Sequence, residues 1–409
     1  MSGYNFDKII DRAGTNSIKW DIHEGELPMW VADMDFETAP EITEAIIKRA
    51  KHGIFGYSDV TDEWYESYID WWKRRHLYTL EKEWLVFCTG VVPAISSIVR
   101  KLTTPAEKVI VFTPVYNIFF NSILNNGRVS VQCPLKYVEN EDFELDHSGY
   151  GNGHYEIDWE LFEEQASDSQ ATLLIFCNPH NPTGTVWDRK TLVRIGEICA
   201  RNGITVVSDE IHCDLICPIG RYMPFIAASE LNRDISVTCV APSKTFNIAG
   251  LNSAAVIVPN KFLRNKVVRG LNTDEVAEPN AFAVQAAIAA YKYGEEWLDE
   301  VRKYIGDNKD LVRKYIDIDD KIPELKYVSG TATYLCWINA TPLEEACKNR
   351  GMNLGKFIRQ ETGLWITDGS AYGEAGRGYL RMNVACPRSY VEDGLDRLRR
   401  GVEALKENE

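Results

Sequence analysis

Residues 172–212 read TLLIFCNPHNPTGTVWDRKTLVRIGEICARNGITVVSDEIH and contain two apolar runs separated by a segment with helical spacing. The runs TLLIFC (172–177) and ITVVS (204–208) are short, rich in β-branched residues and continuously apolar, as strands buried on both faces are. The segment 189–201 between them repeats apolar residues on one helical face. This order predicts two parallel strands joined by a crossover helix.

The same alternation continues on both sides of this stretch. Further strands are predicted at WLVFC (84–88), KVIVF (108–112), VSVQC (129–133), ISVTCV (235–240) and AAVIV (254–258). Further helices are predicted from Pro40, after Thr61 and from Pro93 to Leu102. We therefore predict an α/β fold with a mostly parallel sheet covered by helices on both faces.

Composition narrows the class of protein. The chain has 409 residues, enough for two domains or for one large α/β domain with an appendage. A formal charge of −15 disfavours nucleic acid and anionic membranes as partners. The first residues lack the apolar core of a signal peptide, and no stretch is apolar enough to span a membrane, so a cytoplasmic protein is expected. The ten cysteines form no CxxC pair, which predicts reduced, buried thiols.

Two weak motifs are set aside. His212, Cys213 and Cys217 lie close together but lack the spaced pairs of a zinc site, so no metal is predicted. The stretch GYGNGH (149–154) opens no helix and does not complete a nucleotide-binding glycine pattern, so we expect a surface loop.

In parallel sheets, ligands bind at the carboxyl ends of the strands, and polar residues follow several of the predicted strands. TGVVPAI follows WLVFC: Gly90 permits close backbone approach, and the helix that Pro93 opens offers its free N–H groups to a phosphate. Glycine is common in strand–helix turns, so this signal is weak alone. Tyr116 follows KVIVF and supplies an aromatic ring.

The two strands of residues 172–212 are followed by an amide and an acid. Asn181, in NPHNPTG, has an amide that suits a phenolate-type oxygen, although the two prolines also simply stiffen the turn. Asp209 follows four apolar residues, and burying its carboxylate is costly unless it meets a cation. No basic residue in its own segment supplies that cation.

Lys244 stands in APSKTFNIAG, directly after the predicted strand ISVTCV. An arbitrary lysine at a strand end most often extends into water, whereas a functional one forms an imine with a carbonyl cofactor. The whole set favours the second reading. A phosphate cradle, an aromatic ring, an amide, an acid that needs a cation and an amine together suit pyridoxal 5′-phosphate, with its ring nitrogen on Asp209 and its aldehyde on Lys244.

The motifs TGVVPA, NPHNPTG, SDEIH and APSKTFNIAGLN, in this order and over nearly the whole chain, resemble the class I/II aminotransferase family of pyridoxal-phosphate enzymes. The segments YNFDKIIDRAGTNSIKWD, LPMWVADMDF, SDEIHCDL, ATYLCWI and LRMNVACPRS resemble its cystathionine β-lyase or cysteine-S-conjugate β-lyase branch (MalY/PatB type). The resemblance implies an aspartate-aminotransferase-like fold. Its large cofactor domain would span 50–285, its small domain 1–49 with 286–409, and a long helix in 293–305 would join them.

The resemblance also implies roles for residues. Lys244, Asp209 and Arg381 would be catalytic, with Arg381 gripping the substrate α-carboxylate rather than making a surface salt bridge. Tyr57, in FGYS, would reach the phosphate of the neighbouring subunit in a homodimer with shared sites; a plain core aromatic is the alternative. The cofactor-binding set is Gly90, Val91, Val92, Tyr116, Asn181, Asp209, His212, Ser243, Lys244 and Tyr57.

Three positions depart from the family pattern. Asn252 stands where an arginine commonly binds phosphate, and Ala241 where a serine is frequent. Phosphate binding would then rest on Ser243, the helix N-terminus and Tyr57. His212 stands where transaminating relatives often carry a tyrosine, which favours the lyase branch.

The resemblance thus implies a pyridoxal-phosphate-dependent carbon–sulfur β-lyase that converts L-cystathionine, cysteine or cysteine S-conjugates to a thiol, pyruvate and ammonia. An aminotransferase on the same fold is the first alternative. The second is a cofactor-bearing regulatory protein without turnover, which the presence of Lys244, Asp209 and Arg381 disfavours. Fold alone does not choose among these functions.

Overall fold

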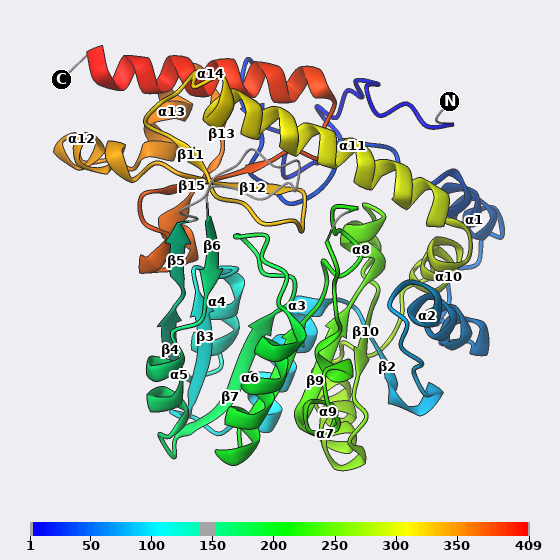
Figure 1. Cartoon of the computed structure of the whole chain (residues 1–409). Coiled ribbons are helices and arrows are strands. Elements are labelled where there is room, and N and C mark those ends of the chain that lie inside the picture. The colour runs from blue at the N-terminus through cyan, green and yellow to red at the C-terminus, as the bar shows by residue number, and fades with distance from the viewer. Residues whose placement is uncertain (1–2, 140–152, 219, 408–409) are drawn as a thin grey trace.

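The computed structural model describes residues 3–139, 153–218 and 220–407. Its main sheet has seven strands (Figure 1). Their spatial order is β2 (Leu85–Cys88), β10 (Ala254–Ile257), β9 (Ser236–Val240), β8 (Thr205–Asp209), β7 (Ala171–Cys177), β3 (Lys108–Thr113) and β4 (Val129–Pro134). Only β10 runs antiparallel to its neighbours, and the five strands from β9 to β4 are parallel. The predicted α/β fold with a mostly parallel sheet is confirmed.

Helices cover both faces of this sheet because both faces of its strands are apolar. Val207 and Ile175 pack toward α3 (Val91–Leu102), α4 (Ile118–Leu124) and α9 (Lys261–Thr273). Val206 and Phe176, one residue away, pack toward α5 (Trp159–Ala166) and α6 (Arg189–Arg201), and α7 (Glu230–Ile235) packs on α6. The alternation explains why the strands read as continuous apolar runs.

Three further helices pack beside β2 and β10. These are α1 (Pro40–Lys51), α2 (Asp62–Arg75) and α10 (Ala283–Tyr293), at the right of Figure 1. The helix predicted after Thr61 is α2, and its aromatic side chains form the core of this group: those of Trp64, Tyr68, Trp71 and Trp72 are fully buried.

A second sheet lies above the carboxyl ends of the main strands (Figure 1). It is antiparallel, with order β11 (Lys326–Tyr327), β12 (Leu335–Asn339), β15 (Tyr379–Asn383) and β14 (Thr367–Asp368). Its core is shared with α11 (Glu295–Arg313), α12 (Glu344–Asn349), α13 (Leu354–Thr362) and α14 (Arg388–Glu407). Two small pairs complete the fold: β1 (Leu27–Pro28) with β13 (Leu364–Trp365), and β5 (Lys136–Glu139) with β6 (Gly153–Glu156).

The long helix expected in 293–305 is α11, which begins at Glu295, after Gly294, and runs to Arg313. Of the glycine-rich stretch 149–154, only Gly153 and His154 are described; they belong to β6, so the surface-loop prediction is wrong for these two residues, and 149–152 lie outside the described residues. The division into 50–285 and 1–49 with 286–409 remains our proposal.

Two further findings concern the cysteines and the helices. All ten cysteines are free thiols, and nine of them are buried. Among the described residues, no helix is both long and apolar enough to cross a membrane.

Candidate active site

A cavity of about 260 Å³ opens at the carboxyl ends of the main strands. Nine of the residues predicted to bind the cofactor line it. These are Gly90, Val91, Val92, Tyr116, Asn181, Asp209, His212, Ser243 and Lys244, together with Ala32, Thr89, Pro93, Cys177, Ile211, Ala249, Asn252 and Ser253. Segments distant in the sequence therefore meet at the carboxyl ends of the main strands, where the sequence predicts a site.

Lys244 lies on the short helix α8 (Pro242–Thr245), directly beyond the end of β9. Its Nζ donates a hydrogen bond to the carbonyl oxygen of Ala32, 2.6 Å away. Burial lowers the pKa of this amine to about 8, and the positive charge of Arg381 acts in the same direction. The neutral, nucleophilic form is therefore accessible near neutral pH.

Asp209 is the last residue of β8 and is only 4% exposed. Burial raises the pKa of its carboxyl group to about 7, although the Ile211 amide donates to Oδ1 at 3.1 Å and Lys244 is nearby. No ion pair to Asp209 is found in the part of the chain that the structure describes. A cation placed against this carboxylate would restore its charged form.

The start of α3 offers groups that suit an anion. The helix begins at Val91, and no side chain caps its first turn. A Cβ at Gly90 would come within 3.1 Å of Pro93 Cδ, so the absence of a side chain here lets Pro93 pack this close to the turn. Ser243 and Asn252 line the same cavity. Free helix N–H groups beside hydroxyl and amide groups suit a phosphate.

Three residues face the cavity with distinct chemistry. Asn181 accepts a hydrogen bond from Arg381 Nη1 through Oδ1 at 3.2 Å, so its amide nitrogen is left to donate elsewhere. His212 is buried, and burial together with nearby positive charge lowers its pKa to about 3, so the ring is neutral. Tyr116 lines the wall with its ring, and burial raises the pKa of its hydroxyl.

Arg381, in the middle of β15, lies outside the residues that line the cavity but contacts its wall. It is 5% exposed, and Nη2 donates to the carbonyl oxygen of Trp30 at 2.7 Å. Its Nε is buried without a hydrogen-bond partner, and no described carboxylate forms an ion pair with it. A buried guanidinium without a counter-ion is suited to an anionic ligand.

Tyr57 is not brought into this cavity. Its side chain is fully exposed, so the alternative of a plain core aromatic is wrong. Its proposed role toward a neighbouring subunit remains a proposal.

Sequence reasoning missed the contribution of Ala32. Its carbonyl oxygen accepts the hydrogen bond from Lys244 Nζ, although Ala32 lies 212 residues away from the lysine in sequence. A backbone carbonyl leaves no residue-type signal, so only the quoted motif LPMWVADMDF marked this segment at all.

A side-chain cluster that spacing did not reveal lies beside the site. His76, Cys213 and Asp214 bring potential metal-ligand atoms within 4.8 Å of one another. His76 Nε2 lies 3.0 Å from Asp214 Oδ1, and Asp214 also accepts from Trp71 Nε1 and Thr245 Oγ1. The carboxylate already has protein partners, so we assign the cluster to holding α2 against α8.

The donor set fits pyridoxal phosphate. Among the described residues, Asp209 has no ion-pair partner for its buried carboxylate, and no side chain caps the start of α3. Burial lowers the pKa of the Lys244 amine. A pyridinium nitrogen, a phosphate and an aldehyde respectively supply what each of these groups needs.

Comparison with known proteins identifies the family of the chain. The family described as aminotransferase class I and II matches residues 27–398. The chain is 40% identical to cystathionine beta-lyase PatB of Bacillus subtilis (strain 168), over 97% of this chain and 99% of PatB. It is 31% identical to the protein MalY of Escherichia coli (strain K12), over 98% and 100%. A PLP-bound C-S lyase from Staphylococcus hominis, complexed with the inhibitor L-cycloserine, has a TM-score of 0.87 and 32% identity, over 98% and 99% of the two chains.

The fold and the site define an enzyme of the aminotransferase-like α/β class. The chain belongs to the class I and II aminotransferase family, and within this family it belongs to the branch that contains the cystathionine β-lyases.

Proposed function

We propose that this protein is a pyridoxal-phosphate-dependent carbon–sulfur β-lyase that releases a thiol, pyruvate and ammonia from L-cystathionine, cysteine or a cysteine S-conjugate. The observation that carries the proposal is one cavity lined by a lysine amine and a buried carboxylate, with a buried guanidinium at its wall; among the described residues neither the carboxylate nor the guanidinium has an ion-pair partner. The likeness to PatB over nearly the whole chain supports the lyase among the reactions of this family.

The chain offers a partner for each part of the cofactor. Lys244 would hold the aldehyde carbon, Asp209 would keep the proton on the ring nitrogen, and Asn181 would donate to the ring oxygen. The phosphate would lie against the start of α3 at Gly90, Val91 and Val92 and against Ser243, and the ring would stack on Tyr116 beside His212. When bound, pyridoxal phosphate supplies a ring that withdraws electrons from the substrate α-carbon.

Arg381 would bind the substrate α-carboxylate with its planar guanidinium, supported by Asn181 and the Trp30 carbonyl. Once substrate has displaced the Lys244 amine from the cofactor, this amine would take the α-proton of the substrate. The lowered pKa of Lys244 leaves a useful fraction of the amine neutral. Asp209 would hold the ring-nitrogen proton throughout. A sulfur substituent on the β-carbon then leaves with its bonding electrons.

Product stoichiometry tests the reaction type. Purified protein is given L-cystathionine, and thiol, pyruvate and ammonia are measured together, with and without a 2-oxo acid. We expect many turnovers without the 2-oxo acid and equal amounts of the three products. A single burst that stalls until a 2-oxo acid is added would instead identify an aminotransferase.

We further propose a cytoplasmic homodimer whose sites are shared, with Tyr57 reaching the cofactor phosphate of the other subunit. The full exposure of Tyr57 in the single chain, beside exposed Ile54 and Phe55, supports this proposal. The absence of paired cysteines supports the reducing compartment.

A further inference from the structure

Residues 30–35, here called the strap, have no regular secondary structure, yet their backbone holds both cationic residues of the site. The Trp30 carbonyl oxygen accepts from Arg381 Nη2 at 2.7 Å. The Ala32 carbonyl oxygen accepts from Lys244 Nζ at 2.6 Å and from Tyr334 Oη at 2.9 Å. The position of the strap therefore sets where Lys244 and Arg381 rest.

Two asparagines, one in β15 and one just beyond α8, tie the strap to the parts of the chain that carry Arg381 and Lys244. Asn383 Nδ2 donates to the carbonyl oxygens of Val31, at 2.5 Å, and of Asp33, at 2.7 Å. Asn247 donates to the Met34 carbonyl at 2.9 Å and accepts from the Met34 amide at 3.0 Å. Asn383 lies two residues beyond Arg381, and Asn247 three beyond Lys244, so the strap is also hydrogen-bonded to residues close in sequence to both cations.

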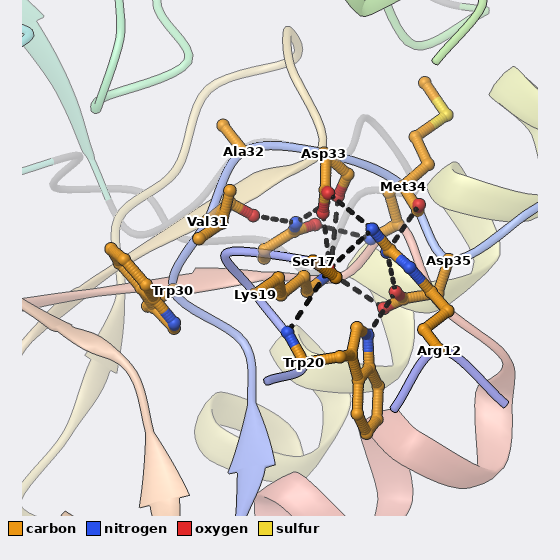
Figure 2. A network of polar contacts seen from close by, with 12 residues as sticks. Arg12, Ser17, Lys19, Trp20, Trp30, Val31, Ala32, Asp33, Met34 and Asp35 are labelled. Carbon is orange, nitrogen blue, oxygen red and sulfur yellow. Dashed lines mark hydrogen bonds and ion pairs between the residues drawn. The ribbon is translucent and has the colours of Figure 1, made fainter. Parts of the chain in front are cut away.

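The side chains of the strap anchor it to the N-terminal segment. Figure 2 shows Asp33 and Asp35 pointing toward Arg12 and Lys19. Arg12 lies 2.8 Å from Asp33 and 2.5 Å from Asp35, and Lys19, only 1% exposed, lies 3.3 Å from Asp33 and 2.7 Å from Asp35. Trp20 Nε1 also donates to Asp35 at 2.7 Å. Two cations and two carboxylates balance in this cluster, in which Lys19 and Asp35 are buried and Arg12 and Asp33 are partly exposed, so each member depends on the others.

Resting on the function proposed above, we propose that Asp33 is a positioning residue for the reaction. Its carboxylate fixes the strap through Arg12 and Lys19, and its negative charge acts on the Lys244 amine, which is bonded to the neighbouring residue of the strap.

The charges around Lys244 support this assignment. Burial lowers the pKa of the amine most; Asp33 is the largest charge effect and raises it, Arg381 lowers it, and Asp209 raises it. Asp35 shares Arg12 and Lys19 with Asp33, but Asp33 alone of the two is a main cause of the pKa shift of Lys244. The two aspartates therefore separate an electrostatic role from a merely structural one.

The test measures the proton affinity of Lys244 directly. Full-length protein, freed of pyridoxal phosphate with hydroxylamine, is treated with trace acetic anhydride from about pH 6 to about pH 10, a range that brackets the amine. Peptide mass spectrometry then gives the pH midpoint of Lys244 acetylation. The variants are Asp33→Asn, Arg12→Gln and, as the matched control, Asp35→Asn, each checked for folding by thermal unfolding.

We expect Asp33→Asn to lower the midpoint by about one pH unit, because it removes a negative charge near the amine. Arg12→Gln should raise the midpoint, because Asp33 then loses a neutralising partner. Asp35→Asn should leave it nearly unchanged. Since Arg12 is partly exposed, its variant decides alone if Asp33→Asn does not fold.

Three results would overturn the proposal. The first is a midpoint that stays unchanged in Asp33→Asn and Arg12→Gln, the second is a midpoint that shifts in the same direction in both variants, and the third is a midpoint that Asp35→Asn shifts as much as Asp33→Asn does. The midpoint does not depend on turnover, so it can be measured even if the protein is not a lyase. If the protein is a lyase but the midpoints do not shift, the role of Asp33 is refuted and the proposed function stands.

Discussion

Asp209 and Glu210 are adjacent and both buried, and burial raises the pKa of each to about 7, yet only Asp209 lines the cavity. Glu210 instead accepts hydrogen bonds from Ser208, Tyr222 and the Phe225 amide. A shifted pKa therefore does not by itself mark a catalytic group; its location does.

This difference predicts opposite outcomes for two substitutions. Asp209→Ala removes the anion that holds the ring-nitrogen proton, and we expect turnover to fall about 100-fold or more, with weaker cofactor retention. Glu210→Gln keeps the hydrogen-bond acceptor and should retain turnover within a few-fold. Steady-state kinetics and the cofactor absorbance measure both effects. Near wild-type turnover in Asp209→Ala would refute its role.

At the scale of elements, Glu210 ties the end of β8 to the segment 222–225, and this tie should depend on pH. The folded pKa of about 7 exceeds the ordinary value of 4.5. Glu210 therefore contributes stability that is present below about pH 4.5 and lost as pH rises through about 7, up to about 3 kcal/mol.

Glu210→Gln removes that loss, so its free energy of unfolding relative to wild type should increase as pH rises from about 4.5 to about 7.5. Denaturant unfolding at several pH values measures the difference. A difference independent of pH, or one that declines as pH rises, would show that Glu210 is already charged when folded.

Most of the main strands were predictable because they are continuous apolar runs bounded by polar residues; the run at 172–177, for example, lies within β7. The antiparallel direction of β10 was not, since a strand buried on both faces has the same pattern in either direction. Two-residue strands such as β11 and β14 are too short to show a period.

The candidate site, too, could be predicted from the sequence only in part. Lys244, Asp209 and Asn181 were predictable because each follows an apolar run, and the parallel sheet brings their side chains to one cavity. The strap was not, because its carbonyl acceptors and the Arg12–Asp33 pair depend on contacts between distant segments. The roles of the site residues remain predictions.

At the scale of the whole molecule, a shared site predicts that two inactive chains can restore each other. In a hybrid dimer of Lys244→Ala and Tyr57→Phe chains, one site combines the intact Lys244 of one subunit with the intact Tyr57 of the other. Mixing the two proteins under subunit exchange should therefore restore activity.

The matched control mixes Lys244→Ala with Asp209→Ala. Both losses fall within the cavity of a single chain, so no hybrid site is complete and no activity should return. An active enzyme that light scattering shows to be strictly monomeric would exclude the shared site.

The account depends most on Lys244 as the residue that holds the cofactor. Reduction of the purified yellow protein with borohydride, followed by peptide mapping, locates the pyridoxyl group directly. The chain provides internal controls, because Lys19 and Lys309 are also buried but lie outside the cavity. We predict a stable adduct on Lys244 alone; an adduct on any other lysine, with Lys244 unmodified, would contradict the account.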